Sequence, residues 1–219
     1  GQLAESERLW REGLESCLQN PKYGPSHHRT LERQFGVGRL LVRQKKTDEA
    51  LSVLPPLIAS YQMQKGSNYF ITLRAEAWLA SALDQKGDTA AVTRLYADMY
   101  PRLMQSVHHV HARYSFEDMA DFFVRERNYA QAKLAYDALR QIYEAVSPKN
   151  GFEWDWFVRA TAATKGWPAA AELCRKEFDR FANTGTACRT MGTVFLYAGD
   201  DAWYRNTTAK AIALSATTT

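Results

Sequence analysis

The chain has 219 residues, of which 46% are hydrophobic and 24% are charged, and its formal net charge is +4. This composition is that of a globular protein able to bury a substantial core, and it lacks the clustered basic stripe of most nucleic-acid-binding proteins. No apolar run approaches the roughly 18 residues that a transmembrane helix requires, so we expect no membrane partner.

Three cysteines, Cys17, Cys174 and Cys188, are widely separated and form no CxxC motif. An odd number of scattered cysteines argues against a disulfide framework or a zinc site. We therefore expect a cytoplasmic protein in which all three thiols are buried on apolar helix faces.

Helical spacing of apolar residues runs through the chain, and strand signals are weak. For example, Ala50, Leu51, Leu54, Leu57 and Ile58 share one helix face. This pattern predicts an all-α chain. With the repeated turns and the family resemblance described below, it is interpreted as a single solenoid of about eleven helices, with a leading helix and five antiparallel helix pairs. The predicted ranges, in chain order, are 5–19, 28–64, 68–105, 112–146, 152–182 and 186–215.

Similar short turns recur along the chain, each between two predicted helices. Residues 50, 92, 132, 170 and 204 occupy equivalent places after these turns and are separated by 42, 40, 38 and 34 residues. Twelve positions earlier stand Gly38, Ala80, Ala120, Val158 and Gly192, of which four are Gly or Ala. Small residues at these positions predict close helix crossings, and the first crossing should be filled by Leu54.

This spacing of small and large residues resembles the tetratricopeptide repeat (TPR). The segment 23–31, Tyr-Gly-Pro-Ser-His-His-Arg-Thr-Leu, is similar to the connector of the long-loop, kinesin-light-chain-like subclass. The resemblance implies antiparallel helix pairs stacked into a right-handed superhelix that binds other proteins. The segment 199–214 loosely resembles helical-repeat regions attached to large bacterial serine/threonine kinases.

Several residues depart from the repeat. Lys45 and Arg127 stand where the turn glycine is expected. Pro55, Pro56 and Pro101 fall inside predicted second helices, where proline removes a backbone hydrogen bond. We expect kinks and not breaks at these prolines, because the apolar face continues beyond them.

The histidines are the first candidates for chemistry. His27 and His28 lie at a predicted helix start, where a structural role is expected. His108 and His111 are the only pair placed to share a metal ion, and the alternative is a hydrated loop. No nucleophile constellation or phosphate-binding loop is present, so we expect a protein that is not an enzyme and that needs no cofactor.

Trp154 and Trp156 lie two residues apart and should face opposite sides, with one exposed.

The resemblance implies that the first helix of each pair lines an inner groove. We call the positions predicted to bind a partner the inner-face set: Phe35, Arg39, Arg43, Arg74, Tyr114, Arg125, Arg159, Arg189 and Tyr197. Further inward positions are Glu32, Val42, Ala77, Ser81, Asp84, Gln85, Glu117, Asp121, Val124, Phe152, Asp155, Ala162, Ala163, Thr186, Thr193 and Leu196.

Arginine captures carboxylates with two parallel hydrogen bonds, and aromatic side chains supply rigid apolar contact. The inner-face set therefore predicts a non-catalytic scaffold for a protein segment that is acidic or ends in a free carboxylate. The alternative for these residues is a solvated face on which Arg pairs with Asp and Glu.

Two other functions stay open from the sequence. One is a sensor that binds a peptide or small ligand. The other is an RNA-binding solenoid, against which the drift in spacing and the interleaved Asp121 and Asp155 argue. The ending Ala216-Thr217-Thr218-Thr219 has no helix stop, so we expect a fragment of a larger protein. The resemblance of the segment 199–214 implies that this larger protein is a multidomain bacterial signalling protein with linked neighbouring domains.

Overall fold

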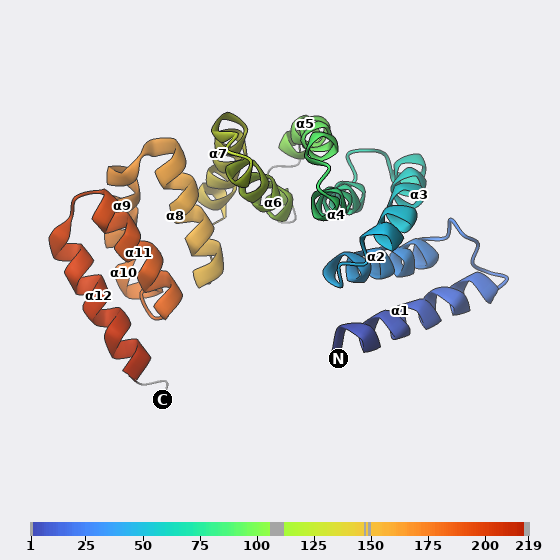
Figure 1. Ribbon diagram of the computed structural model, residues 1–219, viewed down its shortest axis with the longest axis horizontal. Coiled ribbons are helices and arrows are strands. Elements are labelled where there is room, and N and C mark those ends of the chain that lie inside the picture. The colour runs from blue at the N-terminus through green and yellow to red at the C-terminus, as the bar shows by residue number, and fades with distance from the viewer. Residues whose placement is uncertain (1, 106–111, 147, 149, 217–219) are drawn as a thin grey trace. The chain divides into compact units, whose positions relative to one another are not determined.

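The computed structural model describes residues 2–105, 112–146, 148 and 150–216, and in these ranges the chain forms twelve α-helices and no strand (Figure 1). The chain divides into two compact units, Gly1–Ser106 and Val107–Thr219. Each unit is a series of helices in which consecutive helices pack against one another.

The first unit contains five helices: α1 (Gln2–Gln19), α2 (His28–Arg43), α3 (Thr47–Lys65), α4 (Phe70–Lys86) and α5 (Thr89–Gln105). Its core lies between α2, α3 and α4 and includes Leu41, Leu54 and Leu57, each at most 1% exposed. Helices α3 and α5 continue through their prolines, so the expectation that these prolines do not break the helices is confirmed.

The second unit contains seven helices: α6 (Ala112–Arg125), α7 (Tyr129–Ala145), α8 (Gly151–Lys165), α9 (Trp167–Lys176), α10 (Phe178–Phe181), α11 (Gly185–Tyr197) and α12 (Asp201–Ala216). The second helix expected in the fourth pair is divided at Glu177, which has φ −109° and ψ 12°. This division allows Phe178 and Phe181 to enter the core of the unit, and it explains why the described residues form one helix more than predicted.

Close helix crossings occur where the repeat spacing predicts them. A Cβ atom at Gly38 would lie 2.7 Å from Cδ2 of Leu54, the expected large partner. Ala80 and Ala120 are fully buried at the equivalent positions. A second crossing was missed: a Cβ atom at Gly36 would lie 2.2 Å from Trp10 of α1. The leading helix therefore packs as closely as the repeat pairs do.

Four of the turns between helices share one backbone geometry. Lys45, Gly87, Arg127 and Gly199 all have positive φ, at 59°, 79°, 56° and 73°. In each turn the next residue donates its N–H to a carbonyl five positions earlier, as Asn128 does to Phe123 at 2.8 Å. This is the hydrogen bond of the Schellman motif. Lys45 and Arg127 thus adopt the left-handed conformation that glycine adopts elsewhere, which explains why the turn survives without glycine.

Helix α8 lies in the middle of the second unit. It packs against α7 on one side and against α9 and α11 on the other. Trp154 stacks on Phe181 at 4.5 Å between ring centroids, while Trp156 faces Tyr136 at 6.4 Å. Both indoles are buried, at 1% and 6% exposed. The expectation that one of them is exposed is wrong, because packing between neighbouring pairs covers the second face of the helix.

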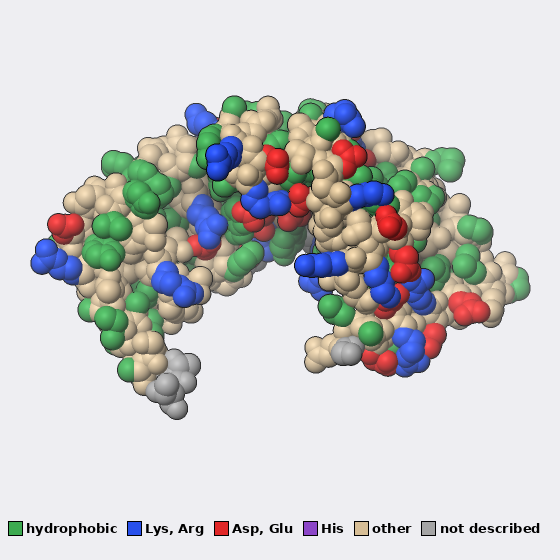
Figure 2. Space-filling model, in the orientation of Figure 1, with side chains coloured by type: hydrophobic (Ala, Val, Ile, Leu, Met, Phe, Trp, Pro, Cys, Tyr) green, Lys and Arg blue, Asp and Glu red, His purple; other side chains and the backbone are tan. Residues whose placement is uncertain are grey.

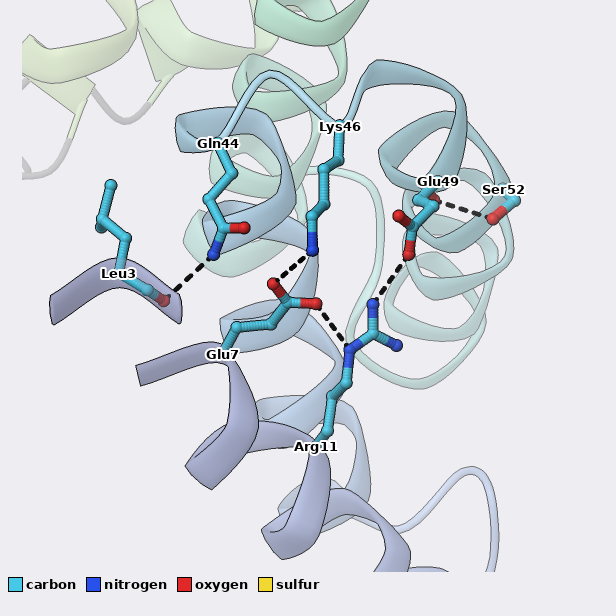
Figure 3. A network of polar contacts seen from close by, with 7 residues as sticks. All are labelled: Leu3, Glu7, Arg11, Gln44, Lys46, Glu49 and Ser52. Atoms are coloured by element: carbon cyan, nitrogen blue, oxygen red, sulfur yellow. Dashed lines mark hydrogen bonds and ion pairs between the residues drawn. The ribbon is translucent and has the colours of Figure 1, made fainter. Parts of the chain in front are cut away.

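A buried carboxylate fastens α1 to the turn between α2 and α3 (Figure 3). Glu7 is 6% exposed and lies 2.7 Å from Nε of Arg11 and 2.8 Å from Nζ of Lys46. Nε2 of Gln44 donates to the carbonyl of Leu3 at 3.0 Å. The hydrogen bond from Lys46 is the main reason that the pKa of Glu7 is lowered. These contacts fix the leading helix in addition to its apolar packing.

Candidate functional site

The histidines near the start of α2 have a structural role. His27 is the N-cap of α2, and its Nδ1 accepts a hydrogen bond from the N–H of Arg29 at 3.3 Å. The rings of His27 and His28 lie 4.3 Å apart. Partial desolvation, followed by the charges of His28 and Arg29, lowers the pKa of His27. A neutral acceptor at this position suits a helix cap, because the first N–H groups of a helix need acceptors.

Metal binding at His108 and His111 falls outside the described residues. Among the residues that the structure does describe, no group of three or more His, Cys, Asp or Glu side chains could hold a metal ion. None of the described helices is long and apolar enough to cross a membrane.

Two of the three cysteines are buried, as expected. Burial raises the pKa of Cys174 to about 12, and it also raises the pKa of Cys188. Both thiols therefore stay protonated near neutral pH and behave as small apolar side chains. Cys17 differs from the expectation, because it is only half-buried on the leading helix.

In the first unit, the inner-face residues come from α2 and α4. Arg43 is exposed, while Phe35, Arg39 and Arg74 are half-buried. On the face shown in Figure 2, basic side chains gather over these two helices with acidic side chains among them. Two further inward positions, Val42 and Ala77, are buried and belong to the core.

Arg39 is the most constrained of these arginines. Its Nε atom is buried and has no hydrogen-bond partner. Burial is the main cause of its lowered pKa, and the positive charges of Arg43 and Arg74 lower it further. Three guanidinium groups thus lie close enough to influence one another, and one of them carries a buried donor without an acceptor.

In the second unit, all five inner-face residues are exposed: Tyr114, Arg125, Arg159, Arg189 and Tyr197. Nε of Arg159 lies 2.8 Å from Oδ2 of Asp155, which also accepts a hydrogen bond from the hydroxyl of Thr190. The alternative of paired charges therefore applies to Arg159.

Two carboxylates placed on the inner face by the sequence are instead buried. Asp155 is 8% exposed and joins α8 to α11 through Thr190. Glu117 is 6% exposed and accepts a hydrogen bond from the hydroxyl of Tyr143 at 2.8 Å. Burial raises the pKa of Glu117 to about 7. The prediction that Asp155 and Glu117 face the inner groove is wrong, because neighbouring helices cover both side chains.

The sequence interpretation missed one exposed aromatic side chain. This residue, Trp167, is 40% exposed and stacks on Tyr197 at 4.8 Å between ring centroids. Gly166 and Pro168 flank this tryptophan, and the equivalent place in the other turns holds Thr47, Thr89, Tyr129 or Asp201, three of which are exposed.

Helix pairs joined by recurrent left-handed turns define an all-α helical-repeat protein of the TPR type. The structure is similar to a kinesin light chain from Podosopora anserina with nearly identical TPR-like repeats, at 15% identity and a TM-score of 0.67, covering 89% of this chain and 97% of that one. It is also similar to BtubC (BKLC) from P. vanneervenii, at 12% identity and a TM-score of 0.73, covering 100% of this chain and 92% of that one.

At these identities the similarity concerns the fold, and it confirms the predicted TPR-like all-α class. No protein-family model matches the sequence, and comparison with curated proteins finds no match.

Proposed function

We propose that this protein is a non-catalytic scaffold that docks an extended segment of another protein, and that the segment carries acidic side chains or a free C-terminal carboxylate. The supporting observation is the arginine cluster of α2 and α4. Nε of Arg39 is buried without a hydrogen-bond partner, and its pKa is lowered by burial and by the charges of Arg43 and Arg74.

A buried donor without an acceptor is unfavourable, and repulsion between like charges adds to that cost. A carboxylate beside Arg39 would satisfy the donor and reduce the repulsion at the same time. Hydrogen bonds to charged groups contribute about 1.5–3 kcal/mol each, so two such bonds would support a weak but specific interaction. The cluster is therefore better suited to an acidic segment than to a neutral or basic one.

Within the second unit, taken by itself, exposed inner-face residues also suit contact with a docked protein segment. Tyr114 and Tyr197 are 37% and 64% exposed, and aromatic side chains are enriched among residues that contribute most to binding. Arg189 is also exposed, and its Nη2 donates to the hydroxyl of Thr186 at 3.2 Å. Because this hydroxyl is neutral, the contact does not compensate the charge of Arg189, and the charge suits an acidic segment too.

The proposal is tested by fluorescence anisotropy with two labelled peptides of equal length. One alternates Glu and Leu and ends in a free carboxylate, and the other has Lys in place of each Glu. We expect the acidic peptide to bind more tightly and its affinity to fall as salt rises. Arg39→Gln combined with Arg43→Gln should weaken binding of the acidic peptide at least tenfold, or about 1.4 kcal/mol.

Arg94→Gln is the matched control, because Arg94 is exposed in the same unit on α5. This variant should bind the acidic peptide as the unchanged protein does. Equal affinity of the unchanged protein for the two peptides would contradict the proposal. Retention of full affinity by the double variant would exclude the arginine cluster as the site.

The wider setting is also part of the proposal. The resemblance of the segment 199–214 to repeat regions of bacterial kinases supports a cytoplasmic module within a multidomain bacterial signalling protein. In that setting the scaffold would bring the docked protein to the linked domains.

A further inference from the structure

A pocket of about 520 Å³ opens in the second unit between α8 and α11, beside α7 and α9. Its size lies in the range of roughly 300–1,000 Å³ that is usual for small-molecule sites. It is also larger than the space that one aromatic side chain of a docked peptide would fill. The pocket is lined by Tyr136, Val158, Arg159, Ala162, Ala163, Trp167, Thr190, Thr193 and Val194.

Most of the lining is apolar. Val158 of α8 and Val194 of α11 are buried, and Ala162 and Ala163 follow Val158 on the surface of α8. Trp167 is held by its stacking on Tyr197, with an angle of 19° between the ring planes. A fixed indole opposite small aliphatic side chains favours a flat apolar ligand, because such a ligand needs no rearrangement of the walls.

The threonine hydroxyls of the pocket already have acceptors within the protein. Thr190 donates to Asp155, and Thr193 donates to the carbonyl of Arg189 at 3.0 Å. Their donor hydrogens therefore add little polarity to the site. The remaining charged group is Arg159.

Arg159 offers a cationic edge at the pocket. Its contact with Asp155 uses Nε, and its guanidinium lies 5.5 Å from the centre of the Trp156 ring. The two terminal nitrogens can still donate to a further acceptor. Asp155 pairs with Nε of Arg159 and accepts a hydrogen bond from Thr190, and Asp121 also interacts with the charge of Arg159, so an anionic ligand would bind through the terminal nitrogens of Arg159.

We propose that this pocket binds a planar, mostly apolar organic anion, such as an aromatic carboxylate. The rings would lie against Trp167 and the alanines of α8, and the carboxylate would accept hydrogen bonds from Arg159. The site is separate from the arginine cluster of the first unit and goes beyond the docking function. Because the lining comes from both α8 and α11, the bound ligand would join two helix pairs and stabilise the second unit.

The test is isothermal titration calorimetry of the full chain with naphthoate and with its neutral analogue naphthylmethanol. We expect one-to-one, saturable binding of naphthoate with a submillimolar Kd and weaker binding of naphthylmethanol. Arg159→Gln should weaken the binding of naphthoate roughly tenfold. It should change the affinity for naphthylmethanol less than about twofold. If Arg159→Gln lowers the affinity for both compounds equally, or for neither, the proposed role of Arg159 is overturned.

Filling the pocket provides a second and independent test. Ala163→Phe and Thr193→Phe introduce bulk from opposite walls at exposed positions, and each should weaken both compounds at least tenfold. Ala130→Phe is the control, since Ala130 is exposed on α7 and does not line the pocket. Absence of saturable binding in the unchanged protein, or full binding by both filled variants, would overturn the proposal.

The two proposals can fail separately. If Arg39→Gln combined with Arg43→Gln weakens acidic-peptide binding and leaves naphthoate binding unchanged, the pocket is an independent ligand site, as proposed. If instead naphthoate never binds while the peptide does, the pocket proposal falls and the docking function stands.

Discussion

The buried carboxyl group of Glu117 makes the stability of this protein depend on pH. Burial raises its pKa from the usual 4.5 to about 7, and this effect outweighs the hydrogen bond from Tyr143 and the charge of Arg113. Between these two pKa values the folded chain holds a proton that the unfolded chain has lost. Stability due to this proton is fully present below about pH 4.5 and is lost as the pH rises through about 7.

Glu117→Gln removes this titration while keeping an acceptor for the Tyr143 hydroxyl. The interval from 4.5 to 7 corresponds, at about 1.36 kcal/mol per pH unit, to about 3 kcal/mol. At pH 8 the variant should therefore be more stable than the unchanged protein by up to about 3 kcal/mol. At pH 4.5 the two proteins should have nearly equal stability.

The measurement is urea unfolding followed by circular dichroism at a series of pH values from about 4.5 to 8.5. Glu126→Gln serves as the control, because Glu126 is exposed in the turn directly after the same helix. Its pH profile should run parallel to that of the unchanged protein. The reasoning from burial is refuted if the stability profile of Glu117→Gln is also parallel to that of the unchanged protein, or if the stability gained by the variant increases toward low pH.

Three further substitutions test the packing and the turns. Arg127→Gly should stabilise the protein by about 1 kcal/mol in urea unfolding, because it relieves a left-handed conformation at φ 56°. Arg102→Leu should destabilise it by about 3–5 kcal/mol, because Nη2 of Arg102 lies 2.8 Å from a carboxylate oxygen of the buried Glu76; adding Glu76→Gln should restore much of the loss. Gly36→Ala should cost about 1–3 kcal/mol and speed proteolysis of α1, because the new Cβ would overlap Trp10.

The sequence predicts the parts of the fold that depend on short spacings. The pairing of Gly38 with Leu54 follows from positions twelve before and four after the same repeat residue, and the structure contains that contact. The turn at Arg127 was identified although the glycine is missing. Such features depend on residues within a single helix pair, where the local period is enough to define which side chains meet.

Contacts between successive pairs were harder to predict. Trp156 of α8 is buried against Tyr136 of α7, a helix outside its own pair. Neither the period nor the charge pattern of α6 or α8 specifies how closely the next pair approaches. For the same reason, the sequence could identify Arg39 as an inward residue but could not reveal that its Nε is buried without a partner.

The pocket lies where the chain departs most from its own repeat. Helix α9 has 10 residues, whereas α5 and α7 each have 17. Gly166 has ψ 168° and begins a different kind of turn from Gly87, whose ψ is 14°. In this turn Trp167 stands where the other turns have Thr47, Thr89, Tyr129 or Asp201, and it contributes a wall of the pocket. Residues that keep the repeat maintain the fold, so the residues that break it are the ones free to be selected for a ligand.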